Sequence, residues 1–286
     1  MNSLTTRPLF IIGNKRSGTS QLVRVLNLHP QVFVSHESDI IWILYQFHHQ
    51  LPFQAHALDS ALGMHQTLKT AGNLLRLEKS PLENFGSVQT ALMEEGTPWL
   101  AAQKKTDLLW IGDKKPMQHT DSELLTFILQ QFPEAHFLHI VRHPFEVVAS
   151  SDKFNQTSNG DFWLNLSPEE KADQWASHEQ QVLLLRQILP ARIHSLRYED
   201  FCRNTEKELS DVFKFLQLEP DSRILKQAAR QTYPLVRAIP KLRCSKQVMD
   251  VAAIYKYDLK HHHGWLRILT YKIYWCLVKY WRLAKL

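Results

Sequence analysis

A short apolar strand that ends in a glycine and leads into a helix is the feature that most restricts the fold of this chain. The run "LFIIG", residues 9–13, is apolar and only a strand in length, which is typical of a buried parallel strand. After "NKRSGTS", apolar residues recur with helical spacing at Leu22, Val25 and Leu26. Backbone N–H groups and the helix dipole at such a junction favour an anion. The order of these elements predicts a phosphate-binding loop.

This loop differs from that of nucleotide triphosphatases at one decisive position. Gly13 and Gly18 have the spacing of G-x-x-x-x-G-K-[ST], but Thr19 stands where that pattern needs lysine. Lys15 and Arg16 supply positive charge earlier in the loop instead. The missing lysine disfavours ATP hydrolysis and kinase chemistry, although a divergent P-loop kinase or nucleotide triphosphatase stays as an alternative. A purely structural glycine turn is the other alternative.

The remaining sequence alternates between strand and helix patterns. Strands are expected within 31–38, 107–116, 135–144 and 191–201, and helices within 20–29, 122–133, 145–154 and 205–219. Such alternation predicts a three-layer α/β fold with a central parallel sheet flanked by helices. We expect one domain over 1–262, with a helical insertion at about 40–109 that shapes an acceptor pocket.

Several polar residues directly follow predicted strands. Besides the loop, these are Glu37, Lys114, Lys115 and Arg142. Ligands of parallel sheets bind outside the carboxyl ends of the strands, so one edge of the sheet is expected to collect them.

A second phosphate-binding pattern occurs in "FLHIVRHPFEVVAS". Arg142 ends a predicted strand, Pro144 suits the first turn of a helix, and Ser150 follows about two turns later. A guanidinium and a hydroxyl placed in this way can hold one phosphate group through charge-assisted hydrogen bonds. The alternative is an arginine that caps a strand and a serine that faces solvent.

The two patterns together resemble the 5′- and 3′-phosphate motifs of sulfotransferases that use 3′-phosphoadenosine 5′-phosphosulfate. "GDKKP" and "SLRYEDF" also resemble segments of bacterial and carbohydrate-type members, so the likeness extends over residues 9–218. The resemblance implies a P-loop-like fold, a sulfotransferase activity (enzyme class 2.8.2) and this sulfated nucleotide as co-substrate. The residues implied to bind it are Lys15, Arg16, Ser17, Gly18, Thr19, Ser20, Arg142, Ser150 and Arg197.

The resemblance also implies catalytic roles. Arg16 or Lys15 would stabilise the charge that grows on the leaving phosphate oxygen. Glu37 is the expected base for the acceptor proton, with His36 as the second choice; strand alternation predicts that only one of them faces the cleft. Lys114 would place or neutralise the sulfuryl group. The alternatives are a surface carboxylate at the start of the next helix for Glu37 and a solvated turn lysine for Lys114.

The sequence departs from the family near its C-terminal end. A glycine-and-lysine motif that binds the nucleotide in cytosolic animal enzymes is not evident, and Lys241, Arg243 and Lys246 are candidates to replace it. Tyr198 and Glu199 could be structural residues rather than ligand contacts.

No metal site is expected. Five of the fifteen histidines stand in two runs, His48–His49 and His261–His263, whose neighbours point in different directions. Cys202, Cys244 and Cys276 are far apart and match no zinc or disulfide spacing.

The charge of the chain is concentrated in its C-terminal tail. The formal net charge is +6 and the pI about 9.1, which suits anionic ligands, nucleic acid or an acidic membrane surface. We expect no nucleic-acid partner. Residues 263–286 predict a basic amphipathic helix that contacts the membrane peripherally or else packs on the core. The expected acceptor is a carbohydrate (glycan), a lipid or another small molecule, and a membrane contact would favour a lipid-linked or glycolipid acceptor. A non-enzymatic binder of anionic surfaces is the third functional alternative.

The start of the chain predicts its compartment. The segment before "LFIIG" is polar, and neither a signal peptide nor a membrane anchor is expected in it. The expected location is the cytoplasm, with peripheral attachment to the inner face of the membrane as a further expectation.

Overall fold

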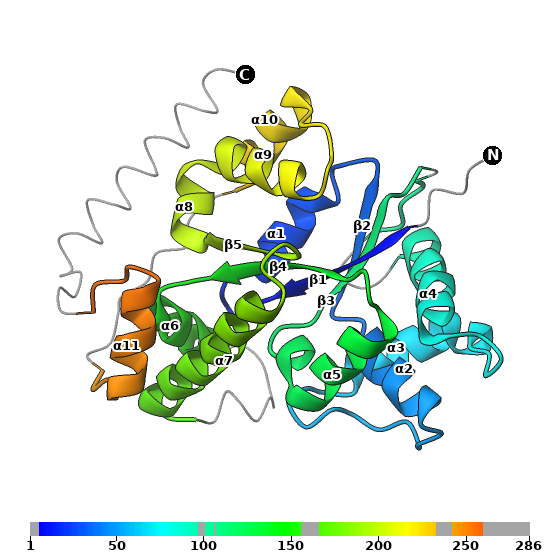
Figure 1. The fold of residues 1–286 in the computed structure, drawn as a ribbon, viewed down its shortest axis with the longest axis horizontal. Helices are drawn as coiled ribbons and strands as arrows, with labels where there is room; N and C mark the ends of the chain where they lie inside the picture. The colour runs from blue at the N-terminus through cyan, green and yellow to red at the C-terminus, as the bar shows by residue number, and fades with distance from the viewer. Residues whose placement is uncertain (1–5, 97–100, 106, 156–165, 233–241, 260–286) are drawn as a thin grey trace.

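A five-stranded parallel sheet forms the centre of the molecule in the computed structural model, which describes residues 6–96, 101–105, 107–155, 166–232 and 242–259 (Figure 1). The spatial strand order is β2-β3-β1-β4-β5, and all four pairings are parallel. The strands are β1 (Arg7–Ile12), β2 (Val32–His36), β3 (Trp110–Lys114), β4 (His136–Val141) and β5 (Ile193–Arg197). The predicted three-layer α/β fold is confirmed.

Helices cover both faces of this sheet. Within β1, Leu9 and Ile11 pack on α1 (Thr19–Leu26), α8 (Tyr198–Arg203), α9 (Thr205–Phe215) and α10 (Ser222–Gln231). Phe10 and Ile12 face the opposite layer, which contains α2 (Ile40–His48), α3 (Leu62–Ala71), α4 (Pro81–Glu95) and α5 (Ser122–Gln131). Alternate side chains therefore enter different cores, which explains the continuous apolar runs of the strands.

A third apolar cluster lies beyond β4. It joins α6 (Pro144–Asn155), α7 (Pro168–Ile188) and α11 (Lys246–Ile254), which lie together in Figure 1. The long helix α7 was not anticipated from the sequence. It begins with a capping box, in which the Ser167 hydroxyl accepts from the Glu170 N–H and the Glu170 carboxylate accepts from the Ser167 N–H.

Local hydrogen bonds set the helix boundaries. The expected helix over 20–29 ends at Leu26, because the Asn27 side chain turns to the backbone of Val34, donating to its carbonyl and accepting from its N–H. Pro81, expected as a break, instead begins α4 behind the N-cap Ser80. Pro144 begins α6 as expected.

The insertion at about 40–109 is largely helical in the structure, with α2, α3, the short 3-10 helix η1 (Gly72–Leu74) and α4. Residues 49–61 connect α2 to α3 without a regular element. A second 3-10 helix, η2 (Gln118–Thr120), follows β3. The tail 263–286 and Lys241 lie outside the described residues. Among the helices that are described, none is long and apolar enough to cross a membrane.

Candidate active site

The strand register brings the predicted residues to one edge of the sheet. In the Cα register His36 pairs with Lys114, Ile11 pairs with the same lysine, and Val141 pairs with Arg197. All of these positions are at or next to the carboxyl ends of their strands. The expectation of a shared edge is therefore confirmed by the pairing.

The loop after β1 is held in one conformation by its own backbone. The carbonyl oxygen of Asn14 accepts from the Ser17 N–H at 3.1 Å and from the Ser17 hydroxyl at 2.7 Å. Ser17 is completely buried, so this hydroxyl supports the loop. Arg16 has a left-handed backbone, with φ at 70°, which is strained for a residue other than glycine. Such strain is common where a backbone is shaped around a ligand.

The start of α1 offers donors to an anion. In the part of the chain that the structure describes, the backbone N–H groups of Gly18, Thr19 and Ser20 donate to no other group. Gly18 has φ at 103°, and a Cβ there would lie 2.4 Å from the Tyr198 ring. Glycine is thus required both by the backbone and by the aromatic ring packed against it.

The two predicted phosphate motifs touch each other. The Arg16 side chain donates from Nε to the Ser150 hydroxyl at 3.3 Å, and Arg142 donates from Nη1 to the Arg16 carbonyl at 3.1 Å. Arg142 also forms an ion pair with Glu146 at 2.9 Å and lies over the Tyr198 ring, 4.4 Å from its centroid. Residues more than a hundred positions apart thus form one basic cluster.

Lys15 points to a different part of the molecule from Arg16. Its ammonium donates to the Leu58 carbonyl at 2.6 Å and pairs with Asp59 at 3.0 Å. Both partners belong to the connection between α2 and α3. Within the part of the chain that the structure describes, the Arg16 side chain contacts the second predicted phosphate motif, whereas these contacts of Lys15 are with the α2–α3 connection.

Glu37 and Lys114 form a close ion pair beside the start of α1. The Lys114 ammonium lies 2.6 Å from the Glu37 carboxylate and 3.1 Å from the Ser20 hydroxyl, which His36 contacts through Nε2 at 2.9 Å. Lys114 is the last residue of β3 and fully buried, so the alternative of a solvated turn lysine is wrong. The expectation that only one of His36 and Glu37 faces the cleft is also wrong. The strand ends at His36, and Glu37 takes a left-handed conformation with φ at 54°, so both side chains reach the same group of atoms.

Burial and the neighbouring charges shift the pKa values of Glu37, His36 and Lys114. Burial opposes the charge of Glu37, but the Lys114 ammonium, with His36, lowers the pKa of this carboxylate to about 2. Burial, together with Lys114, lowers the pKa of His36 to about 4. Burial also lowers the pKa of Lys114, although Glu37 opposes that change. At neutral pH, Glu37 is therefore ionised and His36 is neutral.

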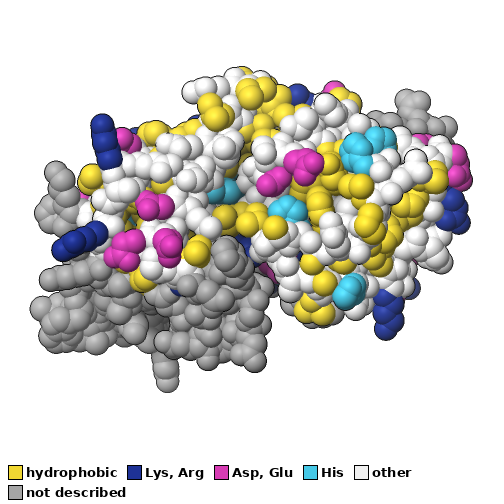
Figure 2. Space-filling model, turned by 90° about the horizontal axis from the view of Figure 1, so that it is seen from below, with side chains coloured by type: hydrophobic (Ala, Val, Ile, Leu, Met, Phe, Trp, Pro, Cys, Tyr) yellow, Lys and Arg dark blue, Asp and Glu magenta, His cyan; other side chains and the backbone are white. Residues whose placement is uncertain are grey.

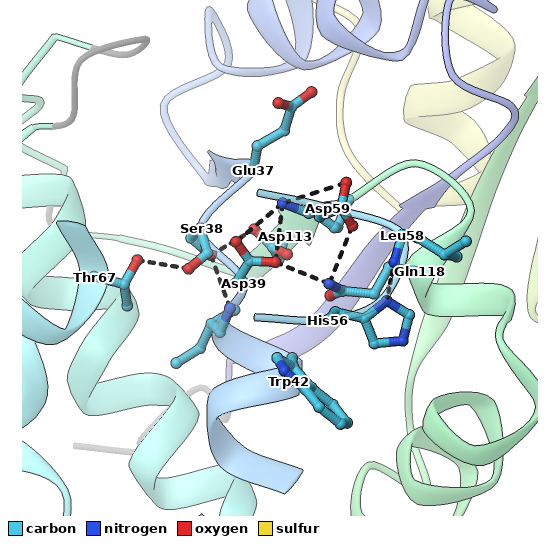
Figure 3. A network of polar contacts seen from close by, with 12 residues as sticks. Glu37, Ser38, Asp39, Trp42, His56, Leu58, Asp59, Thr67, Asp113 and Gln118 are labelled. Atoms are coloured by element: carbon cyan, nitrogen blue, oxygen red, sulfur yellow. Dashed lines mark hydrogen bonds and ion pairs between the residues drawn. The ribbon is translucent and has the colours of Figure 1, made fainter. Parts of the chain in front are cut away.

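A second network of buried charged side chains lies beside the segment that carries Glu37, separate from the Glu37–Lys114 pair (Figure 3). Lys115 pairs with Asp39 at 2.9 Å and with Asp59 at 3.8 Å, and Gln118 donates to Asp39 at 2.8 Å. The Glu37 carboxylate points away from this network in Figure 3. These side chains join the ends of β2 and β3 to the α2–α3 connection. Lys115 was predicted only as a residue at the sheet edge, and the two aspartates were not predicted because they belong to no sequence motif.

Behind this network, Asp113 is completely buried. It accepts hydrogen bonds from the Ser35 hydroxyl at 2.5 Å and the Ser38 hydroxyl at 2.8 Å, and its second oxygen lies 3.1 Å from Nε2 of His119. Burial opposes its charge, yet these contacts lower the pKa of Asp113. They hold the segment that carries Glu37.

Aromatic and acidic groups lie next to Arg142 where β4 and β5 end. Glu199 accepts from the His143 N–H at 2.9 Å and from the Tyr257 hydroxyl at 2.8 Å. Arg197 lies 4.5 Å over the Tyr257 ring. Glu199 therefore supports the start of α6, as the structural alternative proposed, and Arg197 is half-exposed beside it. Of the other basic candidates, Arg243 and Lys246 are exposed, the first just before α11 and the second at its start.

The donors at this edge suit an anionic substrate. Within the described residues, no group of three or more histidine, cysteine, aspartate or glutamate side chains is arranged to hold a metal ion. The site instead combines helix N–H groups, two guanidinium groups and a buried ammonium with a carboxylate. Such a set can bind phosphate or sulfate groups and accept a proton.

Comparison with known proteins identifies the family. The model of the sulfotransferase family matches residues 8–222, most of the chain, and the protein therefore belongs to the sulfotransferase family. No curated protein sequence matches it significantly.

Solved sulfotransferase structures share the fold. The sulfotransferase domain of the curacin biosynthetic pathway is 19% identical, with a TM-score of 0.54, over 89% of this chain and 99% of that one. The sulfotransferase domain of a Synechococcus olefin synthase is 20% identical, with a TM-score of 0.54, over 91% and 98%. A Mycobacterium avium sulfotransferase is 13% identical, with a TM-score of 0.52, over 90% and 78%.

Proposed function

We propose that this protein transfers a sulfuryl group from 3′-phosphoadenosine 5′-phosphosulfate to a hydroxyl or amine of a small acceptor. The observation that carries the proposal is the direct contact between the two phosphate motifs, Arg16 with Ser150 and Arg142 with the Arg16 carbonyl. A ligand with phosphate groups at both the 5′ and 3′ positions can engage both motifs at once. The family supports a sulfuryl donor over a nucleoside triphosphate, and Thr19 at the lysine position agrees.

The chain's own residues supply each part of the transfer. Glu37 takes the proton of the acceptor as the acceptor oxygen or nitrogen forms its bond to sulfur. The bond between sulfur and the bridging phosphate oxygen breaks, and its electron pair stays on that oxygen. Arg16 and the N–H groups at the start of α1 stabilise the resulting charge. The nucleotide product is 3′,5′-adenosine bisphosphate.

Lys114 couples the donor side to the base. While it is paired with Glu37 at 2.6 Å, it keeps the basicity of that carboxylate low. A negatively charged sulfuryl group beside Ser20 attracts the same ammonium. We infer that this attraction loosens the ion pair and leaves Glu37 able to accept the acceptor proton.

The acceptor side is formed by the insertion between β2 and β3. The face shown in Figure 2 carries many hydrophobic side chains over the part of the molecule where Figure 1 places α2, α3 and α5. In the α2–α3 connection, Leu51 is 46% exposed and Phe53 is 42% exposed. An acceptor with an apolar part, such as a lipid or another apolar small molecule, suits this surface better than a highly charged one.

A thermal-shift measurement tests the donor class. Purified protein is melted with 3′,5′-adenosine bisphosphate, with AMP, and with ATP plus magnesium, for the wild type, for Arg142→Ala and for the control Arg203→Ala. Arg203 is an exposed arginine of α8 that pairs with Asp200 at 3.2 Å. We expect the bisphosphate to raise the melting temperature of the wild type and the control, and this shift to be lost in Arg142→Ala. Stabilisation by ATP with magnesium alone would favour the kinase alternative instead.

A further inference from the structure

Helix α7 packs behind both phosphate motifs. Trp175 and Glu179 lie one helical turn apart on it, and both side chains are completely buried. The two side chains contact different motifs, and the Trp175 carbonyl additionally accepts from the Asn14 amide of the loop at 3.4 Å. The helix belongs to none of the segments from which the phosphate site was predicted, so its contribution becomes visible only in three dimensions.

Glu179 holds the loop after β1. Its carboxylate accepts from the Asn14 side-chain amide at 2.8 Å, and Asn14 is also buried. The carbonyl of the same asparagine accepts both hydrogen bonds of Ser17 that shape the loop. The orientation of Asn14 therefore sets the position of the backbone that leads into Arg16.

Trp175 holds the second motif. Its indole N–H donates to the carbonyl oxygen of Arg142 at 3.1 Å. The Arg142 guanidinium in turn donates to the carbonyl of Arg16. The contacts thus close a ring that runs from α7 through Asn14 to Arg16, then through Arg142 and back to Trp175.

The cluster around Glu179 is more polar than stability alone requires. His139 contacts the second carboxylate oxygen through Nε2 at 3.0 Å, and His178 lies 3.3 Å from the first. A buried carboxylate with ionisable partners is often no more stable than a well-packed apolar group. What such a cluster supplies is direction, because the hydrogen bonds that join the Glu179 carboxylate to Asn14 and His178 fix the angle and distance of those partners.

We propose that Trp175 and Glu179 are positioning residues, which hold the 5′-phosphate loop and the 3′-phosphate motif at a fixed separation so that a nucleotide carrying both phosphates is selected. This inference rests on the proposed function, since it takes the ligand to be a 3′,5′-bisphosphorylated nucleotide. A ligand with only one phosphate gains nothing from the fixed separation. The preference for the bisphosphate over AMP therefore measures the role directly.

The first variant is Trp175→Phe, which keeps an aromatic ring but removes the N–H bond to Arg142. Its control is Trp110→Phe. Trp110 is also almost completely buried, and its indole N–H donates to the Leu216 carbonyl at 2.9 Å. It is the first residue of β3 and therefore lies at the amino ends of the strands, away from the phosphate motifs at their carboxyl ends. Dissociation constants for 3′,5′-adenosine bisphosphate and for AMP are measured by titration calorimetry, beside the melting temperature of each protein.

We expect both variants to lose similar stability, because each loses one buried hydrogen bond. In Trp175→Phe, the affinity for the bisphosphate falls about five- to tenfold while that for AMP stays within about twofold. In Trp110→Phe both affinities remain those of the wild type. An unchanged ratio of the two affinities in Trp175→Phe overturns the proposal.

The second test exchanges the donor and the acceptor between α7 and the loop. Asn14→Asp places a second carboxylate next to that of Glu179, and we expect it to abolish bisphosphate binding. Asn14→Ala only removes the hydrogen bond, and we expect it to weaken bisphosphate binding less. Asn14→Asp combined with Glu179→Gln restores the charge and reverses the hydrogen bond. We expect this double variant to bind the bisphosphate more tightly than Asn14→Asp alone. No recovery in a double variant that melts as cooperatively as the wild type counts against the role of Glu179.

The wild type separates this inference from the proposed function. If the wild-type protein binds the bisphosphate no better than AMP, the donor assignment is wrong and the positioning role is overturned with it. If the wild type shows the preference and Trp175→Phe keeps it, only the positioning role is lost.

Discussion

Gly18 illustrates how one residue serves the loop in two ways. Its backbone has φ at 103°, and its missing side chain leaves room for the Tyr198 ring, over which Arg142 lies. The sequence marked Gly18 by its spacing from Gly13. The ring that packs on it belongs to Tyr198, the first residue of α8, and was not predicted because sequence spacing does not show which distant side chain fills a gap.

The first prediction concerns this glycine. We expect Gly18→Ala to lower the free energy of unfolding by about 2–4 kcal/mol, since the new methyl group meets the ring at a strained backbone. The thermal shift with 3′,5′-adenosine bisphosphate should disappear as well. The control is Gly86→Ala inside α4, where a Cβ meets nothing within 4 Å. It should raise stability by about 0.5–1 kcal/mol, as alanine does in helix interiors, and leave ligand binding intact.

The second prediction concerns the ion pair of Glu37 and Lys114. With the pKa of Glu37 at about 2, the carboxylate stays ionised throughout the working range, so no acid limb of kcat/KM arises from it above about pH 4. Removing the ammonium in Lys114→Met leaves burial to raise the pKa of Glu37. An acid limb should then appear in the pH profile, and kcat should fall by about 10²-fold.

The check is the rate of sulfated product formation between pH 4.5 and 8, with an acceptor found by screening hydroxyl compounds. Lys115→Met is the matched control, because Lys115 is a neighbouring buried lysine whose ion pairs are with Asp39 and Asp59. We expect Lys115→Met to change the acid side of the pH profile much less than Lys114→Met does. A profile in Lys114→Met that stays flat on the acid side contradicts the assignment of Glu37 as the base.

Among the secondary-structure elements, the five strands were recognisable and α7 was not. β1 and β4 are largely apolar runs buried on both faces, a pattern that a sequence displays directly, whereas β5 (IHSLR) is half polar and was marked mainly by its place in the alternation of strands and helices. In α7 the buried face includes Lys171, His178 and Glu179, which read as solvent-exposed in a sequence. The segment Ser167–Glu170, with Pro168 after a serine, was the one local signal that could have revealed its start.

The third prediction concerns the connection between α2 and α3, residues 49–61. Asp59 pairs with Lys15 from the loop and lies 3.8 Å from Lys115, so Asp59→Asn removes the charge that holds this connection against the sheet edge. Hydrogen exchange of amides within 51–61 should become faster by about tenfold, because the segment opens more often. Amides of β1 should exchange as before. Unaltered protection across 51–61 would show that the connection is held by other contacts, such as the bond from the Trp42 indole to the Gln54 carbonyl.

Across the molecule as a whole, histidines that are buried or half-buried link stability to pH. Burial is the main cause that lowers the pKa of His29, His56, His136 and His194, and it lowers that of His36 to about 4. The unfolded chain therefore binds protons that the folded protein excludes as the pH falls below about 6.5. The stability that these groups provide is complete above that pH and is lost toward their folded pKa values.

The fourth prediction follows from this linkage. The free energy of unfolding should fall by roughly 2 kcal/mol or more between pH 7 and pH 5 at constant ionic strength. Urea denaturation at pH 7, 6 and 5 measures it. His36→Gln removes one of the contributing groups, so its slope against pH should be smaller than that of the wild type. Equal stability at the three pH values would contradict the shifted pKa values.

The linear sequence was sufficient to predict the parallel α/β fold, which the structure confirms, and it marked the loop after β1 and the segment from Arg142 to Ser150 as candidate phosphate-binding motifs. These properties depend on local order, namely apolar runs, glycine spacing and a proline at a helix start, which a linear chain shows directly. Only the folded chain shows that Arg16 contacts Ser150 while Lys15 pairs with Asp59. The same holds for the group in which Lys114 contacts Glu37 and Ser20, and His36 contacts the same serine. The folded chain also shows that α7 joins the two motifs. Such pairings join segments far apart in the chain, and their directions depend on strand register, backbone conformation and packing, which no local pattern specifies.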